Sequence, residues 1–201
     1  MKEKIVFDRV DMTYKIDGRE IRVFEQFDLE IDPSAFTVLI GKSGSGKTTL
    51  LRLIAGLETP TAGKLSIPPS LRIGMMFQEA RLMPWLTCEK NVLLGLPKDR
   101  RKEARDILRL VGLSGFEKAF PYQLSGGMQQ RAALARTLMR KANYLLMDEP
   151  FGALDAITRK QMQQELLRIR AETNAGILFV THDIEEATTL GDRIVTIGQK
   201  Y

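Results

Sequence analysis

The sequence predicts an α/β fold: a mainly parallel sheet covered by helices, with an N-terminal antiparallel β part and an inserted helical subdomain. Short apolar runs alternate with amphipathic segments along most of the chain, which is typical of parallel sheets. The block of residues 79–123 interrupts this order with mainly helical patterns and repeated Gly and Pro. We therefore expect one domain over residues 1–201, with a core of residues 1–78 and 124–201 and a helical subdomain of residues 79–123.

The N-terminal part reads as an antiparallel hairpin of two strands, Ile5–Tyr14 and Ile21–Ile31. Asp17 and Gly18 form a turn signal between them. Apolar side chains largely alternate with polar ones along the second strand, which indicates one solvated face. These apolar residues are Val23, Phe27, Leu29 and Ile31.

The other expected elements follow in α/β order, apart from the helical block. The expected strands are Phe36–Ile40, Gly63–Ile67, Arg72–Phe77, Asn143–Met147, Ile177–Thr181 and Arg193–Ile197. The expected helices are Thr48–Ala55, Gly126–Met139, Ile157–Glu172 and a short one near Ile184–Leu190. Strands that alternate with helices in this way predict a mainly parallel sheet.

A glycine-rich run, GKSGSGKTTLL, begins at Gly41 between an expected strand and an expected helix. Its spacing matches the phosphate-binding P-loop, in which backbone N–H groups and the helix dipole face an anion. Lys47 supplies a charge near the terminal phosphates, and Thr48 offers a hydroxyl to Mg²⁺. The residues expected to bind nucleotide here are Gly41, Lys42, Ser43, Gly44, Ser45, Gly46, Lys47, Thr48 and Thr49.

Composition excludes several classes of protein. The 201 residues are 44% hydrophobic, which is enough for a sizeable core. No apolar run reaches the ~18–20 residues that a membrane-spanning helix needs, and the N-terminus is too charged for a signal peptide. A single cysteine, Cys88, excludes an internal disulfide and a cysteine-built zinc site.

The net charge of +5 comes partly from the basic run Lys98–Arg105. Such a run can bind nucleic acid or anionic lipid, or it can be the solvated face of a helix. The apolar residues Ala104, Ile107, Leu108 and Val111 follow helical spacing, which favours the solvated face. We therefore expect no nucleic acid partner.

A second strong motif is the apolar run Tyr144–Met147 followed by Asp148 and Glu149. Carboxylates at the C-terminal end of a buried strand lie where ligands bind in open α/β sheets. We assign Asp148 to Mg²⁺ and Glu149 to the base that activates a water for attack on the γ-phosphate. The alternative is a strand that ends in a solvated acidic turn, which the neighbouring P-loop makes less attractive.

A third motif, LSGGMQQR, spans Leu124–Arg131. Ser125 is a good helix N-cap, whereas Gly126 and Gly127 are poor helix formers. Their presence suggests a backbone that approaches a ligand closely. A second anion-seeking helix end is hard to explain by one nucleotide in one chain.

With these motifs, the chain resembles the ATP-binding cassette (ABC) ATPases over essentially its whole length. LSGGMQQR is similar to the signature sequence of that family. By resemblance, Gln78 is the Q-loop glutamine that contacts Mg²⁺ and the attacking water, and Ala153–Asp155 is the D-loop. Tyr14 matches the aromatic residue that stacks on adenine, although a tyrosine there can also serve packing.

The only histidine, His182, follows the expected strand Ile177–Thr181. A lone histidine after a strand is commonly a structural hydrogen-bonder. The resemblance makes it the switch histidine, and an imidazole there could touch the γ-phosphate. The residues expected to take part in catalysis are thus Lys47, Gln78, Glu149 and His182.

The resemblance implies that two cassettes bind head to tail around two molecules of ATP with Mg²⁺. Ser125, Gly126 and Gly127 would then contact nucleotide held by the other chain. The D-loop residue Asp155 is also expected to bind nucleotide. A homodimer or a heterodimer with a sister cassette would satisfy this arrangement. Nucleotide binding would close the pair and hydrolysis would reopen it, as in a ligand-biased switch.

Family members mostly power transport, and the text around Met83–Trp85 and Glu149–Ala156 is similar to ATPases of nitrate, sulfonate and taurine importers. We expect a separate membrane permease to contact Met83–Trp85, although Trp85 could instead pack under its own loop. We further expect a cytoplasmic protein, peripheral on the inner face of the cell membrane, with no regulatory segment after the last strand. An exporter ATPase, a non-transport ABC ATPase acting on nucleic acid, and a non-hydrolytic binding module are the alternatives.

Overall fold

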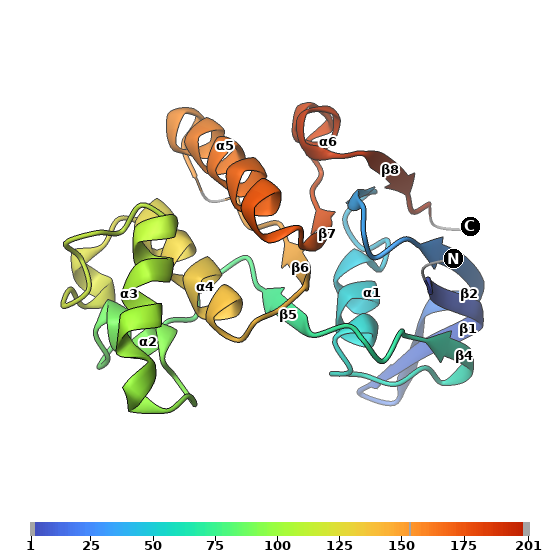
Figure 1. Cartoon of the computed structure of the whole chain (residues 1–201). Coiled ribbons are helices and arrows are strands. Elements are labelled where there is room, and N and C mark those ends of the chain that lie inside the picture. The colour runs from blue at the N-terminus through green and yellow to red at the C-terminus, as the bar shows by residue number, and fades with distance from the viewer. Residues whose placement is uncertain (1–2, 153, 199–201) are drawn as a thin grey trace. The chain divides into compact units, whose positions relative to one another are not determined.

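The computed structural model describes residues 3–152 and 154–198 of the 201-residue chain. It confirms the mixed α/β class and forms two compact units (Figure 1). The first unit runs to Leu71 and resumes at Gly176, and the second runs from Arg72 to Ala175. The predicted division into a core and a helical subdomain of residues 79–123 stays a prediction. Ala153 of the expected D-loop lies outside the described residues.

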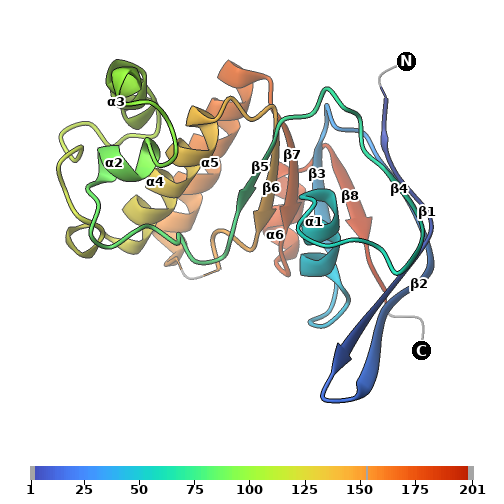
Figure 2. The ribbon, with the colours of Figure 1, turned by 90° about the horizontal axis from the view of Figure 1, so that it is seen from below.

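The first unit contains the predicted hairpin. Strands β1 (Ile5–Ile16) and β2 (Arg19–Ile31) pair antiparallel, and β4 (Ala62–Ser66) pairs with the other edge of β1. Asp17 and Gly18 have φ angles of 49° and 76°. Two left-handed residues in a two-residue loop match the twist of a hairpin, which explains why the long ribbon in Figure 2 turns there.

Strand β1 bulges at Arg9, where the backbone takes a φ of 45°. The Arg9 N–H donates to Asp28 Oδ1 over 2.7 Å, and the register with β4 shifts between Asp8 and Asp11. Gly63 of β4 lies against this bulge with a φ of +80°, and a Cβ on it would be 2.1 Å from the Arg9 carbonyl oxygen. This close backbone approach requires glycine.

The parallel part of the first unit places β3 (Phe36–Ile40) between β7 (Gly176–Val180) and β8 (Arg193–Thr196), as Figure 2 shows. Helix α1 (Lys47–Ile54) follows β3, and helix α6 (Ile184–Leu190) packs against β3. Strands β3 and β7 are almost entirely buried, whereas β8 is largely exposed. Buried residues include Phe36, Val38, Leu39, Ile177, Leu178, Phe179 and Val180.

The second unit pairs β5 (Ile73–Met76) parallel with β6 (Tyr144–Asp148). Its longest helices are α4 (Gly126–Met139) and α5 (Ala156–Thr173). The segment before α4 contains α2 (Cys88–Val92), α3 (Arg101–Leu110) and two 3₁₀ turns, Lys98–Arg100 and Pro121–Gln123. Helix α4 packs against α2, α3, α5 and β5, so it is the central element of this unit.

The sequence-based elements agree with the observed ones to within one or two residues at each end. The block of residues 79–123 is less helical than its patterns suggested, because much of it is loop. One buried amide organises this loop: Asn91 donates to the carbonyls of Met83, Leu86 and Thr87 and accepts from the Met83 N–H. Asn91 is 0% exposed, so these hydrogen bonds stand in for regular secondary structure.

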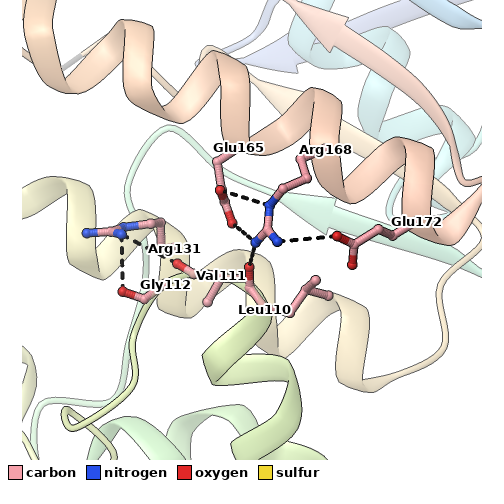
Figure 3. A network of polar contacts seen from close by, with 7 residues as sticks. All are labelled: Leu110, Val111, Gly112, Arg131, Glu165, Arg168 and Glu172. Atoms are coloured by element: carbon pink, nitrogen blue, oxygen red, sulfur yellow. Dashed lines mark hydrogen bonds and ion pairs between the residues drawn. The ribbon is translucent and has the colours of Figure 1, made fainter.

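Two arginines hold the C-terminal end of α3 (Figure 3). Arg131 of α4 donates to the carbonyls of Val111 and Gly112, at 3.5 and 3.3 Å. Arg168 of α5 donates to the Leu110 carbonyl and pairs with Glu165 and Glu172. Cations at a helix C-terminus satisfy its last carbonyls and complement its dipole. Helix α3 is thereby fastened to the two long helices.

We predict that Gly63→Ala destabilises the fold far more than Gly56→Ala. Both glycines have left-handed φ angles, +80° and +68°, but a Cβ on Gly56 would meet nothing within 4 Å. The shared conformational penalty is about 1–2 kcal/mol, and the clash with Arg9 adds about 1–3 kcal/mol more. Thermal unfolding measures the difference, which should be several °C for a chain of this size. Equal melting temperatures would contradict the bulge contact.

Candidate active site

The P-loop wraps the N-terminus of α1 in the first unit. Gly44 and Gly46 have φ angles of 79° and 91°, and Gly46 is the N-cap of α1. A Cβ on Gly46 would lie 2.7 Å from Val23 Cγ1 and 2.8 Å from the Phe24 ring. Gly46 is therefore required by both its backbone angle and its packing on β2. The loop geometry predicted from the sequence is present.

Lys47 is turned into the loop. Its Nζ donates to the carbonyl of Gly41 over 2.7 Å and to that of Lys42 over 3.0 Å, and the residue is only 7% exposed. The loop backbone thus fixes the ammonium at the start of α1, where the helix dipole also favours an anion. This is the arrangement a phosphate-binding lysine needs.

Two further observations fit the loop to a phosphate group. The Ser45 hydroxyl is buried and has no hydrogen-bond partner among the described residues. A Cβ on Gly41 would lie 2.5 Å from the Ile197 carbonyl oxygen and 2.7 Å from Ser45 Oγ, so only glycine fits. A buried hydroxyl without a partner is costly unless a ligand or water satisfies it. These residues therefore suit the phosphates of a nucleotide.

His182 lies on the rim of a cavity of about 490 Å³ that also includes Gly41, Lys42 and Ser43. It follows β7 and precedes α6, whose N-cap Asp183 accepts hydrogen bonds from the backbone of Glu185 and Glu186. The structure thus brings the predicted histidine and the start of the P-loop together within the first unit. A role of His182 in hydrolysis stays a prediction.

Tyr14, the expected adenine-stacking residue, is half-buried on β1. Its hydroxyl donates to Glu58 and lies 3.3 Å from Thr49 Oγ1 in α1. Burial, and then the Glu58 carboxylate, raise the pKa of Tyr14. The hydroxyl therefore ties β1 to the P-loop helix, a contact the sequence did not reveal. Stacking of its ring on adenine stays a prediction.

The second unit carries the two predicted carboxylates at the end of β6. Asp148 ends the strand, and Glu149 follows with a φ of 44°. A left-handed glutamate is a strained conformation of the kind found at functional sites. The Gly152 N–H donates to the Glu149 carbonyl over 3.1 Å and closes a tight turn.

Gln78 comes close to Glu149 at this turn. A Cβ on Gly152 would lie 3.6 Å from Gln78 Nε2 and 3.8 Å from Glu149 Oε2. The predicted Q-loop amide and the predicted base therefore both lie within van der Waals reach of residue 152. The roles of Gln78 in orienting a water and of Glu149 in accepting its proton stay predictions.

The signature segment forms the N-terminus of α4. Ser125 is the N-cap, and its hydroxyl accepts from the Met128 N–H over 3.3 Å. A Cβ on Gly126 would meet nothing within 4 Å, whereas one on Gly127 would lie 2.6 Å from Thr158 Cγ2. Gly126 thus faces open space, as expected for approach to a ligand. Gly127 has a packing role against α5 that the sequence did not reveal.

Asp155, expected in the D-loop, is the N-cap of α5. Its carboxylate accepts from the backbone of Ile157 and Thr158 and from the Thr158 hydroxyl, at 3.0, 2.9 and 2.6 Å. These bonds, the Thr158 hydroxyl above all, lower the pKa of Asp155. The observed role is therefore structural, and contact with nucleotide stays a prediction.

Among the described residues, no three or more His, Cys, Asp or Glu side chains cluster as a metal site. Mg²⁺ keeps several waters and takes one or two protein oxygens together with phosphates. That Thr48, Gln78 and Asp148 bind Mg²⁺ stays a prediction.

The comparisons with known proteins identify the family of the chain. A family model described as "ABC transporter" matches residues 24–152, more than half of the chain. The chain belongs to the ABC transporter ATPase family. The two carboxylates of β6, the P-loop and Gln78 all lie within the matched range.

Two relatives illustrate the membership. The chain is 45% identical over 209 residues to an uncharacterized ABC transporter ATP-binding protein, MJ0412, of Methanocaldococcus jannaschii, covering 98% of this chain and 78% of that protein. It is 48% identical over 175 residues to the aliphatic sulfonates import ATP-binding protein SsuB 1 of Shouchella clausii, covering 87% of this chain and 71% of that protein.

Solved ABC cassettes share the fold. The dimeric bacterial ABC transporter cassette MJ0796 matches with a TM-score of 0.83 and 34% identity, over 96% of this chain and 94% of that one. A second MJ0796 structure, in a post-hydrolysis state bound to ADP and Pi, matches with a TM-score of 0.83 and 32% identity over the same shares. The chain is thus an ATP-binding ABC ATPase subunit.

We predict that Gly127→Ala lowers the melting temperature while Gly126→Ala leaves it nearly unchanged. The new Cβ at residue 127 would strike Thr158 Cγ2, with a cost of about 1–3 kcal/mol. Thr158→Ser removes that methyl group and keeps the hydroxyl that donates to Asp155. The double variant Gly127→Ala with Thr158→Ser should therefore recover stability. Failure of this rescue in thermal unfolding would contradict the packing role.

Proposed function

We propose that the chain energises import of a sulfonate-like solute through a separate membrane permease. The observation that carries this is the identity of about half the aligned residues to an aliphatic sulfonates import ATPase, together with a complete set of P-loop, carboxylate and signature residues. Retention of Lys47, Asp148, Glu149 and His182 supports hydrolysis over a non-hydrolytic binding module.

Each residue has a proposed task in hydrolysis. The backbone N–H groups of the P-loop and the Lys47 ammonium bind the phosphates of ATP. Thr48 and Asp148 would hold Mg²⁺, which would supply positive charge to neutralise the phosphates. Glu149 accepts a proton from the water that Gln78 helps to orient, and His182 donates to the γ-phosphate oxygens.

The signature at the N-terminus of α4 is proposed to act on nucleotide held by a second copy of the chain. Ser125 and Gly126 are exposed, so the N–H groups of this helix start are open to an incoming phosphate. The MJ0796 cassette, 34% identical to this chain, is described as dimeric. Head-to-tail pairing would give each P-loop the signature of its partner.

The loop before α2 is the proposed contact for the permease. Trp85 is 70% exposed, and Met83 is held at both its N–H and its carbonyl by Asn91. An exposed aromatic residue on a firmly held loop is typical of a binding hot spot. The alternative that Trp85 packs under its own loop is disfavoured, because its side chain is largely exposed to solvent.

None of the described helices is long and apolar enough to cross a membrane. We propose that the chain lies at the cytoplasmic face of the cell membrane, bound there by its permease. Two cations of the basic run form ion pairs, Arg100 with Glu103 and Arg105 with Glu89, both at 2.7 Å. The absence of a nucleic acid partner stays a prediction.

We predict that Glu149→Gln slows ATP hydrolysis by about 10²–10⁴-fold, because the amide cannot accept the proton of the attacking water. Since ATP would still bind, size-exclusion chromatography should show a dimer that forms only with ATP and Mg²⁺. The control adds Lys47→Ala to the same chain, which removes the phosphate-binding ammonium and should leave a monomer. Hydrolysis at the wild-type rate would refute the base assignment, and an ATP-bound monomer would refute head-to-tail pairing.

A further inference from the structure

The segment that follows β5 is held by side chains of α4. Gln130 Nε2 donates to the Gln78 carbonyl over 2.6 Å. One and a half turns further along the helix, the Arg136 guanidinium donates to the carbonyls of Ala80 and Arg81, at 2.9 and 2.8 Å. Residues 78–81 lie outside any strand or helix. Their backbone therefore takes its position from α4.

Gln130, which donates to the Gln78 carbonyl, is a buried residue. It is 5% exposed, and its Oε1 atom has no hydrogen-bond partner among the described residues. A buried amide with one end unsatisfied is unfavourable for folding. A methionine of similar shape would fill the same space without that cost. The retained amide therefore points to a role in fixing Gln78 rather than in stabilising the core.

We propose that Gln130 is a positioning residue that couples the signature end of α4 to Gln78. Ser125 and Gly126 lie at the exposed N-terminus of α4. About one turn later, Gln130 donates a hydrogen bond to the Gln78 carbonyl. The Gln78 amide in turn borders the Glu149 carboxylate at Gly152. A shift of α4 when its N-terminus meets a phosphate thus moves the amide beside the base. This inference rests on the proposed action of the signature on nucleotide.

The test replaces the amide donor by a thioether of similar shape, Gln130→Met. Hydrogen exchange of the backbone amides of residues 77–82 should rise about tenfold, because the Gln78 carbonyl loses its partner. The melting temperature should stay near that of the wild type. The turnover number for ATP should fall about tenfold while nucleotide affinity is retained, since Gln130 does not belong to the P-loop.

Two matched controls locate the effect. Gln129→Met makes the same change one residue earlier, where the amide donates to the carbonyls of Pro121 and Leu124. It should raise exchange near residues 121–125 and leave residues 77–82 protected. Gln164→Met, on the exposed face of α5, should leave both exchange and turnover unchanged. If Gln130→Met is insoluble, Gln130→Asn carries the same test, because its amide is one methylene too short to reach.

Wild-type protection of residues 77–82 in Gln130→Met would overturn the proposal. So would a parallel loss of turnover, nucleotide affinity and melting temperature, because that pattern indicates a purely structural role. The exchange measurement needs no nucleotide. It therefore still decides the role of Gln130 if the Glu149→Gln chain fails to dimerise with ATP, an outcome that would count against the proposed function alone.

Discussion

The hydrogen bonds from α4 to the carbonyls of residues 78–81 are the constraint on which the second unit depends. These carbonyls belong to a loop, where no regular secondary structure supplies partners for the backbone. Gln130 and Arg136 supply them, while α4 also packs on α2, α3, α5 and β5. The helix that begins with the signature residues is thereby the one that fixes the loop of Gln78.

Close packing at glycine explains how the remaining parts of the site are set. Gly46 lets α1 start against Val23 and Phe24, and Gly127 lets α4 approach Thr158. At these two positions a side chain would displace a neighbour rather than only a ligand. The glycines of the motifs therefore serve the architecture of the protein as well as the access of phosphate.

Much of the fold was predictable because its elements have strong local signals. The β1–β2 hairpin follows from alternation and the Asp17–Gly18 turn, and the P-loop follows from its spacing. The hydrogen bonds of Gln130, Arg136 and Asn91 to loop carbonyls were not predictable. Side-chain hydrogen bonds to a loop backbone leave no periodic pattern in the sequence. From the sequence, Gly126 and Gly127 were both expected to let the backbone approach a ligand. In the structure Gly126 faces open space, whereas Gly127 lies against Thr158. The pairing of two chains came from resemblance, to which the second anion-seeking helix end at Ser125 added support.

The central claim is that one nucleotide site is built from two chains, and a cysteine pair tests it directly. Ser43 of the P-loop and Ser125 of the signature are both exposed, while Cys88 is buried and its burial raises the pKa of the thiol to about 11, so it should not compete. The double variant Ser43→Cys with Ser125→Cys is treated with a short thiol cross-linker with and without ATP and Mg²⁺. We expect a covalent dimer on a denaturing gel, formed only when ATP was present during the cross-linking. Cross-linking only within one chain, which leaves a monomer on that gel, would contradict it.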